Sequence, residues 1–250
     1  MEITLKGKTA LVTGAGRNIG RGIALAMAQA GANVVVNARS NRLEGESVAE
    51  EARNFGVEAV ALLADIGDAE ADGEMVRNAL KQFGSLDIVV NNAAVRPRQG
   101  ALSITPEEWD RVVRSNLSGA FYLSRAVLPA MIARGHGRII NIASMAGRQV
   151  SLLGGAAYCA SKHGMVSLTQ SINLEAADLG IRASVILPGE VDTPILAVRP
   201  QPVSEKRQSL MLKPEDLGET VVFVANMPPH VSIPEMWIMP TYQVSGTPLP

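Results

Sequence analysis

The chain has 250 residues, of which 47% are hydrophobic and 19% charged, and its formal net charge is -1. This composition is typical of a globular protein with a large core, and the near-neutral balance argues against nucleic-acid and membrane-surface partners. Cys159 is the single cysteine and the three histidines are far apart, which excludes an intrachain disulfide and argues against a metal site. The N-terminus lacks a signal-peptide pattern and no window is apolar enough to span a membrane, so we expect a cytoplasmic protein.

Short β-branched runs alternate with longer Ala-rich stretches along the chain. Strands are predicted at residues 9–12, 33–36, 59–63, 88–90, 138–142, 183–187 and, more weakly, 237–239. Helices are predicted at residues 20–30, 43–55, 68–83, 105–132, 157–179 and 214–224. This alternation predicts one α/β domain over residues 1–250, a Rossmann-type doubly wound parallel sheet of about seven strands with helices on both faces.

Two later segments depart from this rhythm. Residues 193–213 are rich in Pro, Arg and Gln, which predicts a mobile substrate lid rather than a domain linker. Residues 240–250 are expected to form a surface tail.

A glycine-rich turn follows the first predicted strand and leads into a helix. It contains Gly14, Gly16, Arg17, Asn18, Ile19 and Gly20. Free backbone N–H groups and the positive end of the helix dipole at such a turn favour a pyrophosphate. The last glycine falls one residue later than in G-x-G-x-x-G, and a tight turn alone would also use these glycines. The strand–turn–helix context favours cofactor binding.

The ends of the next two strands bear on which nucleotide is bound. A carboxylate after strand two would bond the ribose 2′-OH, whereas an arginine accommodates a 2′-phosphate. Strand two ends in a basic residue, Arg39, and Arg17 could reach the same corner, which predicts NADP(H) in preference to NAD(H). Either arginine could instead be merely solvated. Asp65 and Ile66 are expected on the adenine side, although Asp65 could equally cap the following helix.

Tyr158 and Lys162 are four residues apart in a predicted helix, so their side chains share one face. A phenol titrates near pH ~10 and exchanges protons at neutral pH only if its anion is stabilised by about 3 pH units. A lysine about 4 Å away supplies an effect of that order. A surface Tyr–Lys pair would look the same in isolation, so the neighbouring motifs decide its meaning.

The motifs together resemble the short-chain dehydrogenase/reductase family, in its single-domain branch. The resemblance covers the glycine turn, Asn91-Asn92-Ala93-Ala94, Ser144, Tyr158-x-x-x-Lys162 and Pro188-Gly189, in this order. It implies that Tyr158 is the general acid/base, that Lys162 lowers the phenol pKa and holds the nicotinamide ribose, and that Ser144 orients the carbonyl. It also implies that Asn116 completes a proton relay.

The same resemblance implies further cofactor contacts. The chain also departs from the family pattern, first within the glycine turn. The contacts are Asn91, Asn92, Ala93, Pro188, Gly189, Val191 and Thr193. Asn18 stands where the family usually has glycine, and asparagine is the residue that best tolerates a left-handed backbone there.

The resulting hypothesis is an NADP(H)-dependent oxidoreductase that interconverts a small ketone or aldehyde with an alcohol. The alternatives are a nucleotide-binding regulator or scaffold without turnover, and a 3-oxoacyl-carrier-protein reductase-like enzyme, against which the unusual segment 227–235 argues. Two interpretations of Glu190 remain, a solvated loop acid or a side chain that projects into the pocket. The arginines expected to flank the substrate, each as readily solvated, are Arg96, Arg98, Arg148 and Arg199.

Partners are expected to be copies of the same chain. The resemblance implies a dimer or a tetramer through the two long helices in the middle of the chain. Their apolar residues, which could also simply be core, are Phe121, Tyr122, Leu123, Leu128, Met165, Val166 and Leu168.

Overall fold

The computed structural model describes residues 4–97, 99–150, 152–199 and 202–245. Its single sheet has seven parallel strands in the order β3-β2-β1-β4-β5-β6-β7. The strands are β1 (Thr9–Val12), β2 (Asn33–Ala38), β3 (Ala59–Leu63), β4 (Ile88–Asn91), β5 (Gly137–Ile142), β6 (Ile181–Pro188) and β7 (Glu235–Ile238). The predicted doubly wound sheet is confirmed. The strand order reverses between β1 and β4, and ligands of such sheets bind at the carboxyl ends around this point.

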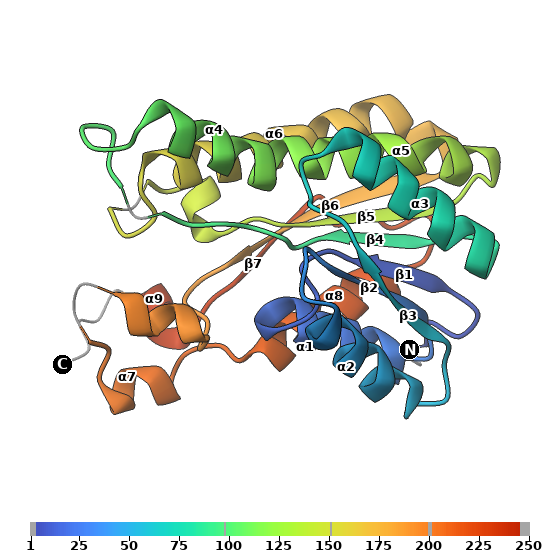
Figure 1. The fold of residues 1–250 in the computed structure, drawn as a ribbon, viewed down its shortest axis with the longest axis horizontal. Helices are drawn as coiled ribbons and strands as arrows, with labels where there is room; N and C mark the ends of the chain where they lie inside the picture. Colours follow the sequence, from blue (N-terminus) through green and yellow to red (C-terminus); the bar gives the residue numbers. More distant parts are fainter. Residues whose placement is uncertain (1–3, 98, 151, 200–201, 246–250) are drawn as a thin grey trace.

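Helices cover both faces of the sheet (Figure 1). On one face lie α1 (Asn18–Gln29), α2 (Arg42–Arg53) and α8 (Pro214–Ala225). On the other lie α3 (Ala69–Phe83), α4 (Pro106–Val113), α5 (Gly119–Ala133) and α6 (Ala156–Ala176). Strand β2 shows how the core is divided, because Val34 and Val36 join the cluster under α1 and α8 while Val35 joins the cluster under α3 and α5.

The predicted helix over residues 105–132 is helical from Pro106 to Ala133, but its hydrogen-bond pattern changes partway. A π-helical turn, η1 (Arg114–Ser118), separates α4 from α5. Asn116 lies in this turn, and its side chain bonds the main chain of Val95 through both amide atoms, at 2.8 and 2.9 Å. Extra residues in single π turns often occur at functional sites, and here the turn places Asn116 beside the loop after β4.

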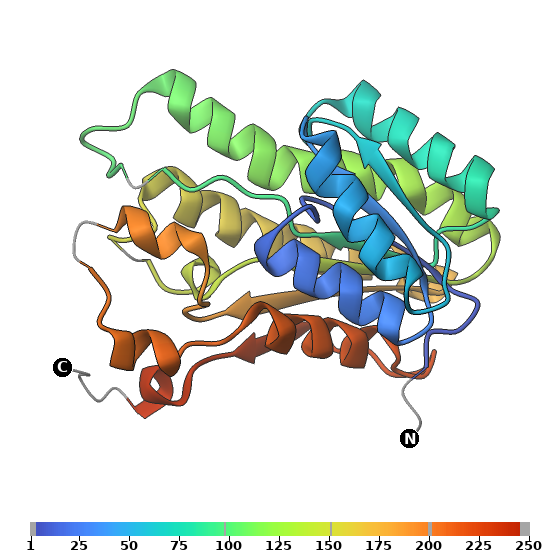
Figure 2. The same cartoon turned by 60° about the horizontal axis from the view of Figure 1, so that its bottom comes forward.

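Three short helices lie in the segments expected to form the lid and the tail. The lid region contains η4 (Pro194–Val198) and α7 (Glu205–Ser209), while residues 241–245, expected in a surface tail, form α9 (Thr241–Ser245). Figures 1 and 2 show α7 and α9 near one another beyond the ends of the sheet. The tail prediction is wrong for these residues because Tyr242 and Gln243 bond to Glu190. Residues 200–201 and 246–250 lie outside the described part.

The apolar residues proposed for an oligomer interface are largely core. Leu123, Met165 and Val166 are buried under the sheet, whereas Phe121 on α5 is 44% exposed. The homo-oligomer therefore stays a prediction with fewer residues behind it. Within the described ranges, no helix is both long and apolar enough to cross a membrane, and no group of three or more potential metal ligands occurs.

One buried acid in this core has an unusual proton affinity. Asp72, in the first turn of α3, is fully buried, and its Oδ1 has no hydrogen-bond partner in the described structure. Burial raises the pKa of Asp72 to about 7, the Gly67 N–H opposes the change, and Asp68 and Asp65 add to it. The folded protein thus keeps a proton that the unfolded chain releases at its ordinary pKa of 3.8. Stability is therefore lost as the pH rises between these two values.

We expect Asp72→Asn to raise the melting temperature at pH 8 and to change it little at pH 4. The amide keeps the shape of the acid and cannot ionise, and each pH unit between the two pKa values corresponds to about 1.4 kcal/mol. Thermal unfolding at several pH values measures the difference. Asp178→Asn, which removes an exposed carboxylate, is the control. A stabilisation by Asp72→Asn that is equal at pH 4 and pH 8 would contradict the account.

Candidate active site

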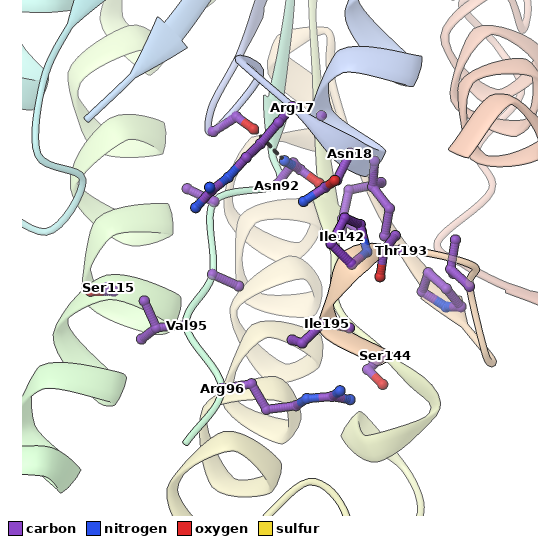
Figure 3. A pocket seen from close by; sticks show the side chains of 18 of the residues that line it. Arg17, Asn18, Asn92, Val95, Arg96, Ser115, Ile142, Ser144, Thr193 and Ile195 are labelled. Carbon is purple, nitrogen blue, oxygen red and sulfur yellow. Dashed lines mark hydrogen bonds between the residues drawn. The ribbon is translucent and has the colours of Figure 1, made fainter. Parts of the chain in front are cut away.

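A cavity of about 930 Å³ lies at the carboxyl ends of the central strands. Figure 3 shows Arg17, Asn18 and Asn92 at one end and Arg96, Ser144 and Ile195 at the other. The residues predicted to bind cofactor that line it are Gly14, Gly16, Arg17, Asn18, Ile19, Gly20, Arg39, Asp65, Ile66, Asn92, Ala93, Tyr158, Pro188, Gly189, Val191 and Thr193. Ser144 also lines the cavity. Lys162 and Asn116 do not reach its wall, and both are about 99% buried behind it (relative exposure 1% each).

The glycine-rich turn has the backbone conformation that its sequence requires. Gly14 has φ 60°, and Asn18, where α1 begins, has φ 52°, the single positive φ at a non-glycine position in the described ranges. The expected left-handed Asn18 is thus confirmed. A Cβ on Gly20 would lie 2.3 Å from the carbonyl oxygen of Gly14, so only glycine fits where the helix passes the turn.

Three polar side chains hold this turn against the neighbouring strand ends. The Thr13 hydroxyl accepts from the N–H groups of Asn92 and Ala93, at 2.9 and 3.0 Å. The Asn92 amide donates back to the Thr13 carbonyl at 2.8 Å, and Asn37 accepts from the Gly14 N–H at 3.1 Å. The loops after β1 and β4 and the end of strand β2 are therefore tied into one unit.

Two side chains differ from their expected positions. Asn91, expected at the cofactor ribose, ends β4 facing the core, where its amide donates to Asn141 at 2.8 Å and to Ser124 at 3.3 Å. That prediction is wrong, because the side chains of successive strand residues point to opposite faces and Asn92 takes the cavity side. The alternative that Asp65 caps a helix is also wrong, since Asp68 caps α3 through the N–H groups of Glu70 and Ala71.

Asn116 connects the loop after β4 with helix α6. Besides its two bonds to Val95, its amide donates to the Ser161 hydroxyl at 3.1 Å, and Ser161 donates to the Tyr158 carbonyl at 2.8 Å. Asn116 thus positions the backbone that carries Tyr158. Its role in a proton relay stays a prediction.

Tyr158, Ser144 and Lys162 come together as expected from the sequence. Ser144 and Tyr158 both line the cavity, close enough for the serine hydroxyl to lower the pKa of the phenol, and the Ser144 Oγ accepts from the Ala146 N–H at 3.1 Å. The Lys162 Nζ lies 5.7 Å from the centroid of the Tyr158 ring and donates to the Ile142 carbonyl at 2.7 Å. A hydroxyl and a phenol therefore face one point in the cavity, with an amine behind them.

The proton affinities of this pair differ from the expectation. Burial raises the pKa of Tyr158 above its ordinary value, while the charge of Arg96 and the hydrogen bond with Ser144 oppose that effect. Burial also lowers the pKa of Lys162 to about 7. The expected lowering of the phenol pKa by Lys162 is not seen, because desolvation removes much of the lysine charge that would produce it.

Glu190 is neither a solvated acid nor a free pocket group. Its side chain is 9% exposed, and it binds Arg199 at 2.7 Å, Arg207 at 2.9 Å and the hydroxyl of Tyr242. Burial alone would raise the pKa of Glu190, but the bonds from Tyr242, Arg199 and Arg207 hold it below its usual range. This Glu190 cluster ties the residues after β6 to η4, α7 and α9.

The flanking arginines separate into different roles. Arg96 and Arg199 line the cavity. Arg148 does not line it, and forms an ion pair with Glu235 at 2.6 Å. The expectation that Arg148 faces the substrate is therefore wrong. Arg98 lies outside the described residues.

The family model of the short chain dehydrogenases matches residues 8–203, more than half of the chain. The chain belongs to the short-chain dehydrogenase/reductase family. It is thus an oxidoreductase that acts on CH–OH and C=O groups with a nicotinamide nucleotide.

Relatives of this short-chain dehydrogenase agree in length and architecture. It is 36% identical to the 3-oxoacyl-[acyl-carrier-protein] reductase of Staphylococcus aureus, over 88% of this chain and 91% of the relative. It is also 36% identical to the D-beta-hydroxybutyrate dehydrogenase of Cupriavidus necator, over 89% and 92%. A metagenomic short-chain oxidoreductase solved in complex with NADP is 34% identical, with a TM-score of 0.82 over 95% of this chain and 98% of that chain.

Several residues of the site carry no motif that sequence reasoning could use. Asn37 lies within a strand, and Tyr242 and Gln243 lie in the segment taken for a tail. Their only signal is polarity within or beside apolar sequence, and their partners Gly14 and Glu190 are 23 and 52 or 53 residues away.

We expect Glu190→Gln to loosen the attachment of α7. Glutamine keeps the size but loses the charge that holds Arg199 and Arg207, and each charge-assisted bond contributes roughly 1.5–3 kcal/mol. A loss of about 1.4 kcal/mol raises the open population tenfold, so tryptic cleavage after Lys206 or Arg207 should accelerate by at least about that factor.

Glu235→Gln serves as the matched control, because it removes an acid that pairs with Arg148 outside the Glu190 cluster. Its cleavage pattern at Lys206 and Arg207 should equal that of the wild type. Equal cleavage rates for Glu190→Gln and the wild type would show that Glu190 does not hold this segment.

Proposed function

We propose that this enzyme reduces a small ketone or aldehyde with NADPH, and oxidises the matching alcohol with NADP+, with Tyr158 as general acid/base. The observation that carries the proposal is that the Ser144 hydroxyl and the Tyr158 phenol lie together on the wall of the cavity that the glycine-rich turn also lines. A non-catalytic nucleotide binder has no need of this pair, nor of an amine buried behind it.

Each of these residues would have its own role at the reacting carbonyl. Ser144 and Tyr158 would bond the carbonyl oxygen, where negative charge develops during reduction. NADPH, when bound, supplies the hydride. Tyr158 would give its phenolic proton to that oxygen, and in the reverse direction would take it back. Lys162, anchored by the Ile142 carbonyl, regains charge as the phenolate forms, because a nearby anion favours its protonated state.

The cofactor would extend from the Ser144 end of the cavity to the arginine corner. The glycine-rich turn at the start of α1 suits its pyrophosphate, and Asn92, Ala93, Asp65 and Ile66 suit its adenosine half. The remaining proposed contacts, on the nicotinamide side, are Pro188, Gly189, Val191 and Thr193. Lys162 has further N–H donors beside the one bound to the Ile142 carbonyl, and with one of these it would bond the nicotinamide ribose.

The preference for NADP(H) rests on charge. Arg17 and Arg39 are both exposed side chains on the wall of the cavity, after β1 and β2. A 2′-phosphate between them would make charge-assisted bonds that NAD(H) cannot make. The structural relative in complex with NADP supports this choice.

The relatives leave the substrate open. A 3-oxoacyl-carrier-protein reductase and a hydroxybutyrate dehydrogenase are equally similar to this chain, so similarity alone favours neither. We also propose that the enzyme is cytoplasmic and that it forms a homo-oligomer. The oligomer is supported by two exposed apolar side chains, Phe121 on α5 and Leu174 on α6, the latter 90% exposed.

We expect Tyr158→Phe to lower kcat for carbonyl reduction by about a thousandfold, since general acid–base catalysis contributes roughly 10²–10⁴-fold. The affinity for NADPH, measured by fluorescence titration, should stay within about threefold, because the ring remains. Tyr122→Phe on α5 is the matched control and should keep full activity. A fully active Tyr158→Phe enzyme would exclude the mechanism.

We expect Arg39→Ala to lower kcat/KM for NADPH by roughly tenfold or more and to leave kcat/KM for NADH nearly unchanged. Adding Arg17→Ala should remove most of the remaining preference. Arg77→Ala, an exposed arginine on α3, controls for the loss of surface charge. A wild-type enzyme that uses NADH and NADPH equally well would contradict the charge argument.

A further inference from the structure

Arg96 introduces a cation beside the reacting end of the cavity. It follows Val95 in the loop after β4, and its Cζ lies 5.8 Å from the centroid of the Tyr158 ring. Figure 3 shows its side chain extending across the cavity toward Ser144. The Asn116 bonds to both main-chain atoms of Val95 fix the backbone from which Arg96 extends.

This guanidinium has no counter-charge within the protein that the structure describes. Its Nε is buried and has no hydrogen-bond partner among these residues, and no described carboxylate forms an ion pair with it. One acid on the cavity wall, Glu190, is already bound to Arg199 and Arg207. A partly buried guanidinium without a partner favours an anion from solution.

The other acids on the cavity wall belong to the opposite end. Asp65 follows β3 and Glu44 lies in α2, both beside the proposed adenosine site. Arg96 and the two arginines held by Glu190 therefore leave the substrate end with an excess of positive charge.

We propose that Arg96 binds a carboxylate of the substrate, so that the enzyme acts on short oxo acids and the matching hydroxy acids. This inference rests on the proposed function, because it places the carboxylate relative to a carbonyl held by Ser144 and Tyr158. A guanidinium beside the phenol ring reaches a carboxylate one or two carbons from that carbonyl, and its planar fork donates hydrogen bonds to both carboxylate oxygens.

The proposal is tested by comparing the reduction of 3-oxobutanoate and of its methyl ester by the wild type. The two differ in the charge that Arg96 would bind, so kcat/KM for the acid should exceed that for the ester at least about tenfold. Arg96→Gln should lose roughly a hundredfold on the acid and less than about fivefold on the ester, and Arg96→Lys should recover part of the loss.

Two further measurements separate binding from folding and turnover. With NADP+ present, butanoate should raise the melting temperature of the wild type and not that of Arg96→Gln. NADPH affinity should be unchanged in Arg96→Gln. Arg148→Gln, which removes an arginine outside the cavity, should keep the wild-type ratio of acid to ester.

The outcomes distinguish this inference from the function on which it rests. Equal losses on acid and ester in Arg96→Gln would mean that Arg96 acts on the Tyr158 phenol instead of the substrate, and would overturn the proposal. A wild type that reduces neutral carbonyls but shows no preference for acids, and no stabilisation by butanoate, would overturn it while leaving the reductase intact. If the wild type reduced no carbonyl compound with NADPH, the proposed function itself would be overturned.

Discussion

The carboxyl end of a parallel sheet exposes backbone groups that no neighbouring strand can pair, and the site of this enzyme depends on how side chains satisfy them. Thr13, Asn37 and Asn92 bond the turns after β1 and β4 and the end of strand β2 to one another. These bonds fix the turn whose free N–H groups face the cavity, so the same network that stabilises the sheet end also shapes the cofactor site.

Asn116 plays the corresponding part on the other side of the site. By bonding Val95 and Ser161 it joins the loop after β4 to the helix that carries Tyr158 and Lys162. The resulting enclosure has an electrostatic consequence, because burial raises the pKa of Tyr158 further above neutral and lowers the pKa of Lys162 to about 7, which weakens the positive charge available to stabilise a phenolate. In the proposed function, charges on the cofactor and the substrate would act on this pair together with Arg96, whose charge lowers the pKa of Tyr158.

The sequence predicted most of the fold and most of the residues that line the cavity, because these depend on local patterns. Strands buried on both faces read as apolar runs, and the glycine turn could be placed from its own residues, including the left-handed Asn18. The π turn at Asn116 was missed, since it interrupts the helix without changing its apolar pattern. The side chain of Asn91 was predicted on the wrong side of strand β4. The motif alone does not show toward which face of the sheet a given strand residue points.

The sequence by itself determined the order of strands and helices along the chain and the family. It also showed that Ser144, Tyr158 and Lys162 belong to one group of residues. Motif spacing and periodicity can be recognised without knowledge of packing. Tertiary structure alone decided the partners and charge states of the ionisable groups. Glu190 meets Tyr242 from 52 residues away, and Arg96 is left without an acid in the described structure. The physical reason is that burial and pairing depend on segments brought together by folding, and these two quantities control the free energy of a charge.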